Sequence, residues 1–483
     1  MDENTVKQSS SRITPRHEDF SEWYHDIIAQ ADLAEHSGIK GSMIIKPYGY
    51  ALWENIQKVL DAKIKETGHE NAYFPLLIPE SYLKKEAQHV EGFAPELAVV
   101  THAGGEKLEE PLVVRPTSET IINASFSRWV QSWRDLPLLI NQWANVVRWE
   151  LRPRLFLRTT EFLWQEGHTA HATQQEAQEE QKKMLDVYTD LAENYMAMPV
   201  IDGEKSAAER FAGAESTYTI EAMMQDGKAL QAGTSHALGQ NFAKAFDITF
   251  SDKDGTTKHV WTTSWGVSTR LIGGLIMTHS DDDGLVLPPN IAPTQVVIIP
   301  IGRESDLEQV VTAANNVAEK LKQAGVTVRI DTRDNYTPGH KFNEWEKKGV
   351  PVRLELGPRD LAADQVVVVR RDTKDKETVG LADVTAKVKQ LLEDIQKNLY
   401  YQARLRRDER TFTIDDYATF QERIEHGAFL YAHWCGSEEC EKQIKDETKA
   451  TIRCIPFDQP AETGTCIKCG GASHKRALFA RAY

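Results

Sequence analysis

Cysteine is scarce in this chain, and its scarcity excludes a small secreted protein held together by disulfides. Only five of the 483 residues are cysteine, and all five lie after position 434. A disulfide framework needs a dense, even-numbered set of cysteines in a short chain. The clustering near one end of the sequence instead predicts a metal site.

Long apolar runs are also absent. No stretch approaches the roughly 18 apolar residues of a membrane helix. The opening segment, Met1–Ser11, is polar and lacks the apolar region of a signal peptide. The sequence therefore predicts no membrane partner and a cytoplasmic location.

Strong compositional bias is missing too. Charged residues make up 27% and hydrophobic residues 41% of the chain, which is typical of globular proteins and excludes disorder as the main state. The formal net charge of −15 argues against general coating by nucleic acid, but it permits one basic groove on an acidic body. The length predicts two or three domains.

Changes of pattern divide the chain into segments. Amphipathic helical stretches mix with short strands up to Pro289, which predicts an α+β domain with a largely antiparallel sheet. After a Pro-rich break at 287–293, alternating strands and helices predict an α/β domain, and the last segment contains every cysteine. The expected units are residues 1–19, a flexible segment, then residues 20–289, 290–399 and a small α+β unit at 400–483.

Helical spacing is clearest near the start of the first domain. Leu52, Ile56, Leu60 and Ile64 recur on one helical face, and the helix is expected to stop near Gly68 before a short strand at 72–74 and Pro75. A second apolar stripe at 184–195 predicts another core helix.

The most informative run is Val146–Glu150. Side chains two apart on a strand share a face, so Arg148 can grip a phosphate or carboxylate while Glu150 reads an amino group, as ATP demands. A loop then leads to Arg158 and to Phe162, an aromatic face for a base. Taken alone, the stretch is more typical of an exposed hairpin with an ion pair.

The run does not stand alone. The helix, strand and proline near Pro75, the Arg148–Glu150 strand and the strand-to-helix segment around Arg270 resemble motifs 1, 2 and 3 of class II aminoacyl-tRNA synthetases. The third motif departs from the class at Thr269, where the class has an acidic residue. Four further runs resemble the prolyl-tRNA synthetase family, of the short archaeal and eukaryote-like type without an editing insertion: 115–119 (RPTSE), 164–168 (WQEGH), 211–214 (FAGA) and 231–236 (QAGTSH).

The resemblance implies a fold and an activity. The fold would be a class II catalytic domain, with an antiparallel sheet and flanking helices, followed by an α/β anticodon-binding domain and a zinc-binding C-terminal domain. The activity would be proline:tRNA ligation, in which ATP with Mg²⁺ activates L-proline to prolyl-adenylate for transfer to the 3′ end of tRNA(Pro). By analogy with class II enzymes, a homodimer would form through the elements before Pro75.

Proline offers an ammonium, a carboxylate and a small apolar ring, so its pocket needs an anion, a cation and flat walls. By resemblance, Thr117 and Glu119 would hold the ammonium and Arg148 the carboxylate and the α-phosphate. Arg148 and Arg270 would be the catalytic residues, and no protein nucleophile is needed because positioning and charge stabilisation suffice. The ring would be enclosed by Trp164, Glu166, His168, Phe211 and His236.

The resemblance also implies a nucleotide site, formed by Arg148, Glu150, Arg158, Phe162, Gln231, Thr234, Ser268 and Arg270. Glu150 would contact the adenine and Phe162 would stack on it. Gln231 and Thr234 would lie near the ribose and the Mg²⁺ water shell.

The run 339–360 carries the candidates for reading the anticodon. Proline anticodons contain two adjacent guanines, and arginine pairs with guanine O6 and N7 while a carboxylate accepts from its amino edge. Glu346, Arg353 and Arg359 are expected to read these bases. The alternative is that these charges form a solvated face.

The cysteines are spaced as metal ligands. Cys435 and Cys440 are separated from Cys466 and Cys469 by 25 residues, a pattern that predicts a tetrahedral structural zinc site rather than free buried thiols. Cys454 would be left over. By resemblance, Tyr483 would reach toward the active site.

Two other functions stay open at this point. One is a synthetase-like binding protein without catalysis, which intact Arg148, Glu150 and Arg270 disfavour. The other is a class II ligase for serine, threonine or glycine, which the Thr117-x-Glu119 run and the C-terminal cysteines disfavour. With no room for an editing domain between Arg158 and Gln231, we expect mischarged alanyl-tRNA not to be cleared by this chain.

Overall fold

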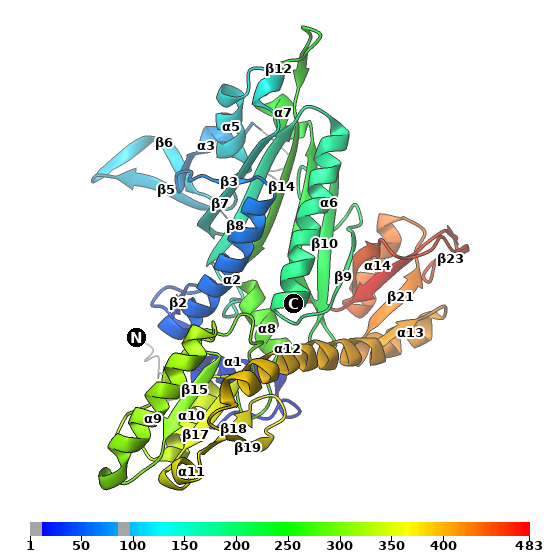
Figure 1. The fold of residues 1–483 in the computed structure, drawn as a ribbon. Helices are drawn as coiled ribbons and strands as arrows, with labels where there is room; N and C mark the ends of the chain where they lie inside the picture. The colour runs from blue at the N-terminus through cyan, green and yellow to red at the C-terminus, as the bar shows by residue number, and fades with distance from the viewer. Residues whose placement is uncertain (1–11, 86–96) are drawn as a thin grey trace.

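The structure, a computed structural model, describes residues 12–85 and 97–483. Figure 1 shows three regions in chain order: a central body, a lower α/β unit and a module that projects to one side. The helices are α1 (Phe20–Gln30), α2 (Pro47–Glu66), α3 (Glu80–Leu83), α5 (Glu119–Trp129), α6 (Gln174–Asp190), α7 (Asn241–Ala245), α8 (Arg270–His279), α9 (Glu304–Gln323), α10 (Pro338–Lys347), α11 (Pro358–Ala362), α12 (Val384–Glu409), α13 (Tyr417–Glu425) and α14 (Glu438–Thr448).

The strands of the central body are β1 (Ala34–His36), β2 (Met43–Ile45), β3 (Glu70–Asn71), β4 (Leu77–Pro79), β5 (Ala98–Ala103), β6 (Glu106–Val114), β7 (Leu138–Val147), β8 (Glu161–His171), β9 (Val200–Glu204), β10 (Ser216–Met223), β11 (Ala229–Gly239), β12 (Thr249–Ser251), β13 (Thr257–His259) and β14 (Trp261–Ser268). Those that follow are β15 (Val296–Pro300), β16 (Val328–Ile330), β17 (Val352–Leu356), β18 (Gln365–Arg370), β19 (Lys376–Gly380), β20 (Thr411–Thr413), β21 (Phe429–His433), β22 (Thr451–Pro456), β23 (Gly464–Thr465), β24 (Ala472–Ser473) and β25 (Arg476–Ala480).

The central body is built on a large sheet. In it β9, β10, β11, β14, β8 and β7 pair antiparallel in that order, and the short β3 joins parallel at the β7 edge. Helix α6 lies along this sheet (Figure 1), and its apolar stripe packs with α2 and α8 in the largest hydrophobic core. The predicted α+β domain with an antiparallel sheet is confirmed.

The α/β unit has a five-stranded sheet in the order β16-β15-β17-β18-β19. Strands β16, β15 and β17 are parallel and the last two are antiparallel. Strand β15 is buried throughout, as its continuous Val-Val-Ile-Ile run predicts for a parallel strand covered on both faces. Helix α12 then leaves this unit and runs across residues 399 and 400 without a break.

The projecting module extends the central sheet rather than standing apart. Its strands β20, β21, β25 and β22 pair in that order, and β22 pairs with β9 of the central body, so that one sheet has 11 strands. Gly203 permits this join, because a Cβ at that position would lie 2.5 Å from the Ile455 carbonyl oxygen. The strands of the module and of the central body therefore form one continuous hydrogen-bonded sheet.

Two local expectations differ from the structure. Residues 72–74 are not a strand, since the Phe74 N–H bonds the Gln142 side chain instead of a neighbouring backbone. Strand β7 ends at Val147, so Arg148 lies just beyond it, although its N–H still bonds the Thr160 carbonyl at 2.8 Å. Of the segment expected to be flexible, residues 1–11 lie outside the described part.

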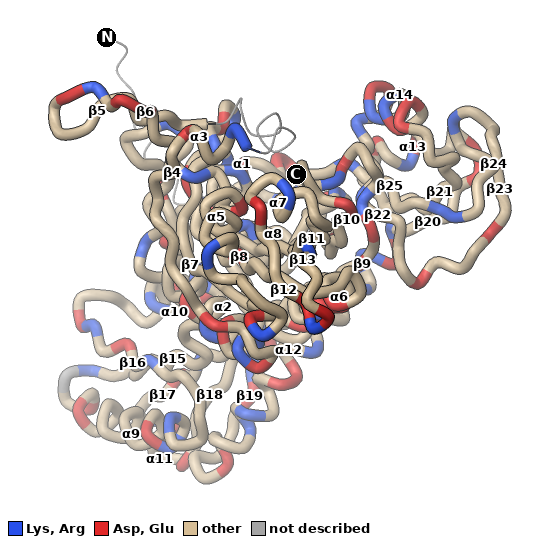
Figure 2. The backbone as a smooth tube through the Cα atoms, turned by 90° about the horizontal axis from the view of Figure 1, so that it is seen from above, with Lys and Arg blue, Asp and Glu red and all other residues tan. Residues whose placement is uncertain are grey.

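Residues 12–19 are held in place. Ile13 is buried in the core, and the Arg16 side chain pairs with Asp282 at 2.9 Å, so tertiary contacts fix a segment that looked featureless. Positive and negative residues are interspersed along the surface elements rather than segregated by sign (Figure 2). Within the described ranges, no helix has both the length and the apolar character that crossing a bilayer requires.

Candidate active site and metal centre

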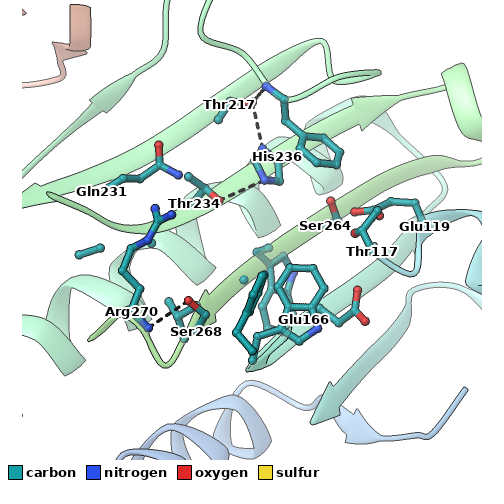
Figure 3. Close-up of a pocket in the computed structure, with 18 of the residues that line it drawn as sticks. Thr117, Glu119, Glu166, Thr217, Gln231, Thr234, His236, Ser264, Ser268 and Arg270 are labelled. Atoms are coloured by element: carbon teal, nitrogen blue, oxygen red, sulfur yellow. Dashed lines mark hydrogen bonds between the residues drawn. The ribbon is translucent and has the colours of Figure 1, made fainter. Parts of the chain in front are cut away.

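A cavity of about 270 Å³ opens over β8, β11 and β14, where the predicted motifs converge. Figure 3 shows Gln231, Thr234 and Arg270 on one side of it and Thr117 and Glu119 on the other. Every residue predicted to enclose proline lines this cavity, together with predicted nucleotide contacts: Thr117, Glu119, Arg148, Trp164, Glu166, His168, Phe211 and His236, and also Phe162, Gln231, Thr234, Ser268 and Arg270.

One end of the cavity is anionic. Glu119 is buried in the first turn of α5 and accepts a hydrogen bond from the Thr117 hydroxyl. The partial positive charge of a helix N-terminus stabilises a carboxylate placed there. The pair thus forms a buried acceptor site suited to an ammonium group.

The floor of the cavity holds a second buried carboxylate. Glu166 and His168 lie two apart on β8, so both point to the same face. Glu166 accepts from Gln142 Nε2 at 2.9 Å and bonds His168 Nε2 at 2.8 Å. Burial alone would lower the pKa of His168, but this hydrogen bond and the charges of Glu166 and Glu119 outweigh it, so the pKa is raised.

His236 has the opposite character. Its ring stacks on Phe211 with centroids 4.5 Å apart and bonds Thr217 at 2.9 Å and Thr234 at 3.2 Å. Burial lowers its pKa to about 4. His236 is therefore a neutral, flat wall at physiological pH.

The other end of the cavity is cationic. Arg148 Nε donates to the Pro116 carbonyl at 2.9 Å, and its guanidinium lies 5.5 Å from the Phe162 ring and 5.4 Å from the Trp164 ring. Arg270 Nε donates to the Leu157 carbonyl at 3.2 Å. Burial and the neighbouring arginines lower the pKa of Arg270 to about 10, which leaves it protonated at neutral pH.

An adjoining cavity of about 250 Å³ shares Arg148, Phe162, Ser268 and Arg270 with the first and adds Glu150 and Arg158. Glu150 and Arg158 approach each other at 3.6 Å. All the residues predicted for the nucleotide thus border one of two connected cavities, with arginines at their junction.

Sequence reasoning missed some of the lining. Glu209, Thr217 and Ser264 border the larger cavity without having been assigned a role. Glu209 lies two residues before the 211–214 run, outside that motif, so no residue pattern marked it. The Trp164 indole N–H and the Ser264 hydroxyl are buried there without a hydrogen-bond partner in the structure, which suits a polar ligand.

The α/β unit has its own cavity, of about 200 Å³. It is lined by the predicted Glu346 and Arg353, whereas Arg359 lies on α11 outside the lining. Arg359 therefore does not border this cavity, and its expected part in reading the anticodon stays a prediction. Four further basic residues, for which the sequence predicted no role, also line it: Arg370, Arg371, Lys374 and Lys376.

The four predicted cysteine ligands converge. Their sulfur atoms all lie within 4.8 Å of one another, and Cys435 and Cys469 are 3.7 Å apart. Zn–S bonds of about 2.3 Å in a tetrahedron give S···S edges of about 3.8 Å, so the set fits zinc. The Gly471 N–H donates to Cys469 Sγ at 3.4 Å, so this sulfur also has a backbone hydrogen bond. Cys454 is buried elsewhere, in β22.

Tyr483 packs beside the loop that follows β7. Its hydroxyl donates to Asp226 at 2.5 Å, and the Arg154 guanidinium lies 5.2 Å from its ring. Tyr483 thus lies against Arg154 of the loop between β7 and β8.

Comparison with known proteins decides the family. Residues 101–279 match the tRNA synthetase class II core domain (G, H, P, S and T), residues 295–391 an anticodon binding domain, and residues 417–483 the prolyl-tRNA synthetase C-terminal domain. The chain is 60% identical to the proline–tRNA ligase of Porphyromonas gingivalis strain W83, over 98% of this chain and 99% of that protein. The chain belongs to the prolyl-tRNA synthetase family.

Other members of the prolyl-tRNA synthetase family support the same assignment. The proline–tRNA ligase of Alkaliphilus oremlandii is 57% identical over 99% of both chains. A crystal structure of prolyl-tRNA synthetase from Cryptosporidium parvum, complexed with halofuginone and AMPPNP, superposes with a TM-score of 0.94 at 42% identity, covering 98% of this chain and 97% of that one. The expected order of class II core, anticodon-binding domain and C-terminal domain with its cysteine cluster is confirmed.

Proposed function

We propose that the two connected cavities bind L-proline and ATP, and that this chain is a proline–tRNA ligase. The observation that carries the assignment is one cavity with a buried carboxylate, Glu119, at one end and two arginines, Arg148 and Arg270, at the other. The ammonium of an amino acid needs a negative group, and the phosphates of a nucleoside triphosphate need positive groups. The two ends of this cavity supply these opposite charges.

The first step forms prolyl-adenylate. A carboxylate oxygen of proline attacks the α-phosphorus of ATP, the new P–O bond forms, and the bond to the β-phosphate oxygen breaks, so that pyrophosphate leaves with the electron pair. Arg148 binds the carboxylate and the α-phosphate, and Arg270 stabilises charge on the leaving phosphates. In the second step a terminal ribose hydroxyl of tRNA attacks the adenylate carbonyl and AMP leaves.

The amino-acid half is assigned to the anionic end. Glu119 and Thr117 accept from the proline ammonium. The neutral His236 avoids repelling that ammonium, since burial keeps its pKa near 4. Trp164, Glu166, His168 and Phe211 complete the proposed enclosure of the ring.

The nucleotide half is assigned to the arginine junction. Glu150 reads the adenine amino group, Phe162 stacks on the base, and Arg158 contacts the γ-phosphate. Ser268 borders both cavities. Gln231 and Thr234 offer neutral oxygens to ribose and to the water shell of Mg²⁺, which would neutralise phosphate charge when bound.

Zinc is proposed for the four-cysteine site. Cys435, Cys440, Cys466 and Cys469 supply four thiolates, a set that leaves no position for substrate, so the proposed zinc stabilises the C-terminal module and takes no part in the reaction.

The tRNA is proposed to span the molecule. Glu346, Arg353 and Arg359 are the candidates for the anticodon guanines, and basic residues surround the first two. The proposed subtype is the short one without editing, supported by the short path from β8 through α6, β9 and β10 to β11. The proposed functional units are residues 20–289, 290–399 and 400–483. The proposed assembly is a homodimer. The proposed location is the cytoplasm, where tRNA charging serves translation.

The decisive test is exchange of pyrophosphate into ATP with each of the twenty amino acids and no tRNA. We expect exchange with proline alone, and a loss of at least about a hundredfold in Arg148→Ala, which removes transition-state charge stabilisation. Exchange with another amino acid would overturn the substrate, and no exchange with any would favour a binding protein without catalysis.

A further inference from the structure

We propose that helix α14 of the C-terminal module positions the pocket loop, residues 205–215, and thereby sets the affinity for the amino acid. This inference deepens the proposed function and rests on it. The role is one of positioning, because α14 itself does not border the cavity.

The pocket loop belongs to the amino-acid half of the site. It connects β9 to β10 and brings Glu209 and Phe211 to the larger cavity. The adjoining cavity with Glu150 and Arg158 has no lining residue from this loop. A shift of the loop would therefore disturb the amino-acid site while leaving most nucleotide contacts in place.

Two residues on one face of α14 hold the pocket loop. Ser206 donates its hydroxyl to Glu441 Oε1 at 2.7 Å, and both side chains are buried. Four residues along the helix, Lys445 approaches Glu209 at 3.2 Å. Positions i and i+4 share a helical face, so one rigid helix surface fixes the loop at its beginning and at a lining residue.

The root of the loop is fastened to the same module. Glu221 lies between Lys205, at 2.8 Å, and Arg453 of β22, at 3.0 Å, and these side chains are 0%, 2% and 8% exposed respectively. Removing one member would leave a buried charge without compensation. This cluster anchors the fold, whereas the α14 contacts beyond it adjust the loop.

The position of α14 depends in turn on the cysteine site. Cys440 lies in the first turn of the helix, and Glu441 follows it directly. A metal held by the four thiolates would fix the start of α14, and with it the acceptor for Ser206. The physical path from the metal site to Phe211 therefore runs through Cys440, Glu441 and Ser206.

The test compares variants of the full-length, zinc-loaded protein. Ser206→Ala and Glu441→Ala remove the buried hydrogen bond, Glu441→Gln keeps an acceptor of the same shape, and Lys445→Met removes the outer ion pair. Lys442→Met, an exposed lysine on the same helix, is the matched control. Each variant is measured for KM with proline and with ATP in pyrophosphate exchange, for direct proline binding by equilibrium dialysis, and for zinc content.

We expect Glu441→Ala and Ser206→Ala to weaken proline binding about tenfold because a buried charged hydrogen bond is lost. Glu441→Gln should restore most of it. Lys445→Met should weaken it about threefold, as suits a partly exposed pair, and Lys442→Met should not change it. KM for ATP should stay within about twofold in all variants because the nucleotide cavity lacks loop residues.

Two results would overturn the proposal. One is unchanged proline binding in both Ser206→Ala and Glu441→Ala. The other is an equal rise in KM for proline and ATP, which would indicate a general structural role. If the unmodified protein fails to exchange with proline at all, the proposed function falls, whereas normal exchange that Glu441→Ala leaves untouched removes only this inference.

Discussion

Two buried histidines in the same cavity have pKa values that are shifted in opposite directions. His168 is bonded to Glu166, and its pKa is raised, while His236 contacts hydroxyls and an aromatic ring, and its pKa is lowered to about 4. The difference comes from one neighbouring carboxylate, since burial pushes both pKa values down. The raised pKa favours a proton on His168, whereas His236, in the wall that would face an ammonium, is neutral at physiological pH.

Glu166→Gln is expected to reverse the pKa shift of His168. Without the carboxylate, burial becomes the dominant influence, and the pKa should fall below the usual value of 6.5. Titration of the ring protons by NMR measures the change. Glu179→Gln, on the exposed face of α6, should leave the titration as it is, and an unchanged pKa in Glu166→Gln would contradict the assigned cause.

At the scale of elements, the first turn of α14 ties the cysteine site to the rest of the module. Cys440→Ser is expected to abolish stoichiometric zinc binding and to speed amide hydrogen exchange in α14, because the helix loses the ligand that fixes its start. Exchange in β8 and β14 should be unaffected. Elemental analysis and hydrogen exchange with mass spectrometry check both parts.

Cys454→Ala provides the control for that change. This cysteine lies in β22, away from the four converging sulfur atoms, so zinc should be retained. Full zinc content in Cys440→Ser, or loss of zinc in Cys454→Ala, would show that the ligand set is wrong.

Sequence patterns predicted elements well where the cause is local. The spacing of Leu52, Ile56 and Ile64 matches helix α2, and the strand-to-helix step before Arg270 matches β14 and α8. Prediction failed where a residue far away in the sequence determines the local structure. The Gln142 side chain takes the N–H of Phe74, and Asp282 fixes Arg16. Neither partner is visible in a local window.

The candidate site follows the same division. Residues inside recognisable motifs, such as Glu119, Arg148 and His236, meet in one cavity. Arg353 lines the cavity of the α/β unit, whereas Arg359, from the same short run of sequence, lies on α11 outside that lining. Glu209 was missed because its role depends on how a loop folds over the sheet, which residue spacing does not specify.

At the scale of the whole molecule, several histidines are buried in neutral form. Burial lowers the pKa of His171 to about 4 and of His279 to about 3, as it does for His236. In the unfolded chain these groups titrate near 6.5, so between about pH 6.5 and pH 4 the unfolded state binds more protons. Their contribution to stability is complete above pH 6.5 and declines as the pH falls.

We therefore expect the free energy of unfolding to fall between pH 6.5 and pH 4, by on the order of 2 kcal/mol for each buried histidine. Denaturant titrations across this range measure it. His279→Asn keeps a donor for the Met196 carbonyl and should flatten the slope by one proton. Carboxylates such as Asp331, with a pKa lowered to about 2, lose their contribution only at lower pH, and a flat profile down to pH 5 would contradict the prediction.

The pairing of β9 with β22 affects how the C-terminal module can evolve as well as how the chain folds. Residues 417–483 match a family domain of their own, yet excising them would uncover the β9 edge and leave Glu221 without Arg453. A replacement module from another gene would need a strand edge that pairs with β9. It would also need a cation at position 453 and a hydrogen-bond acceptor for Ser206. We therefore expect recombination at this boundary to be disfavoured, and the catalytic body and the module to change together.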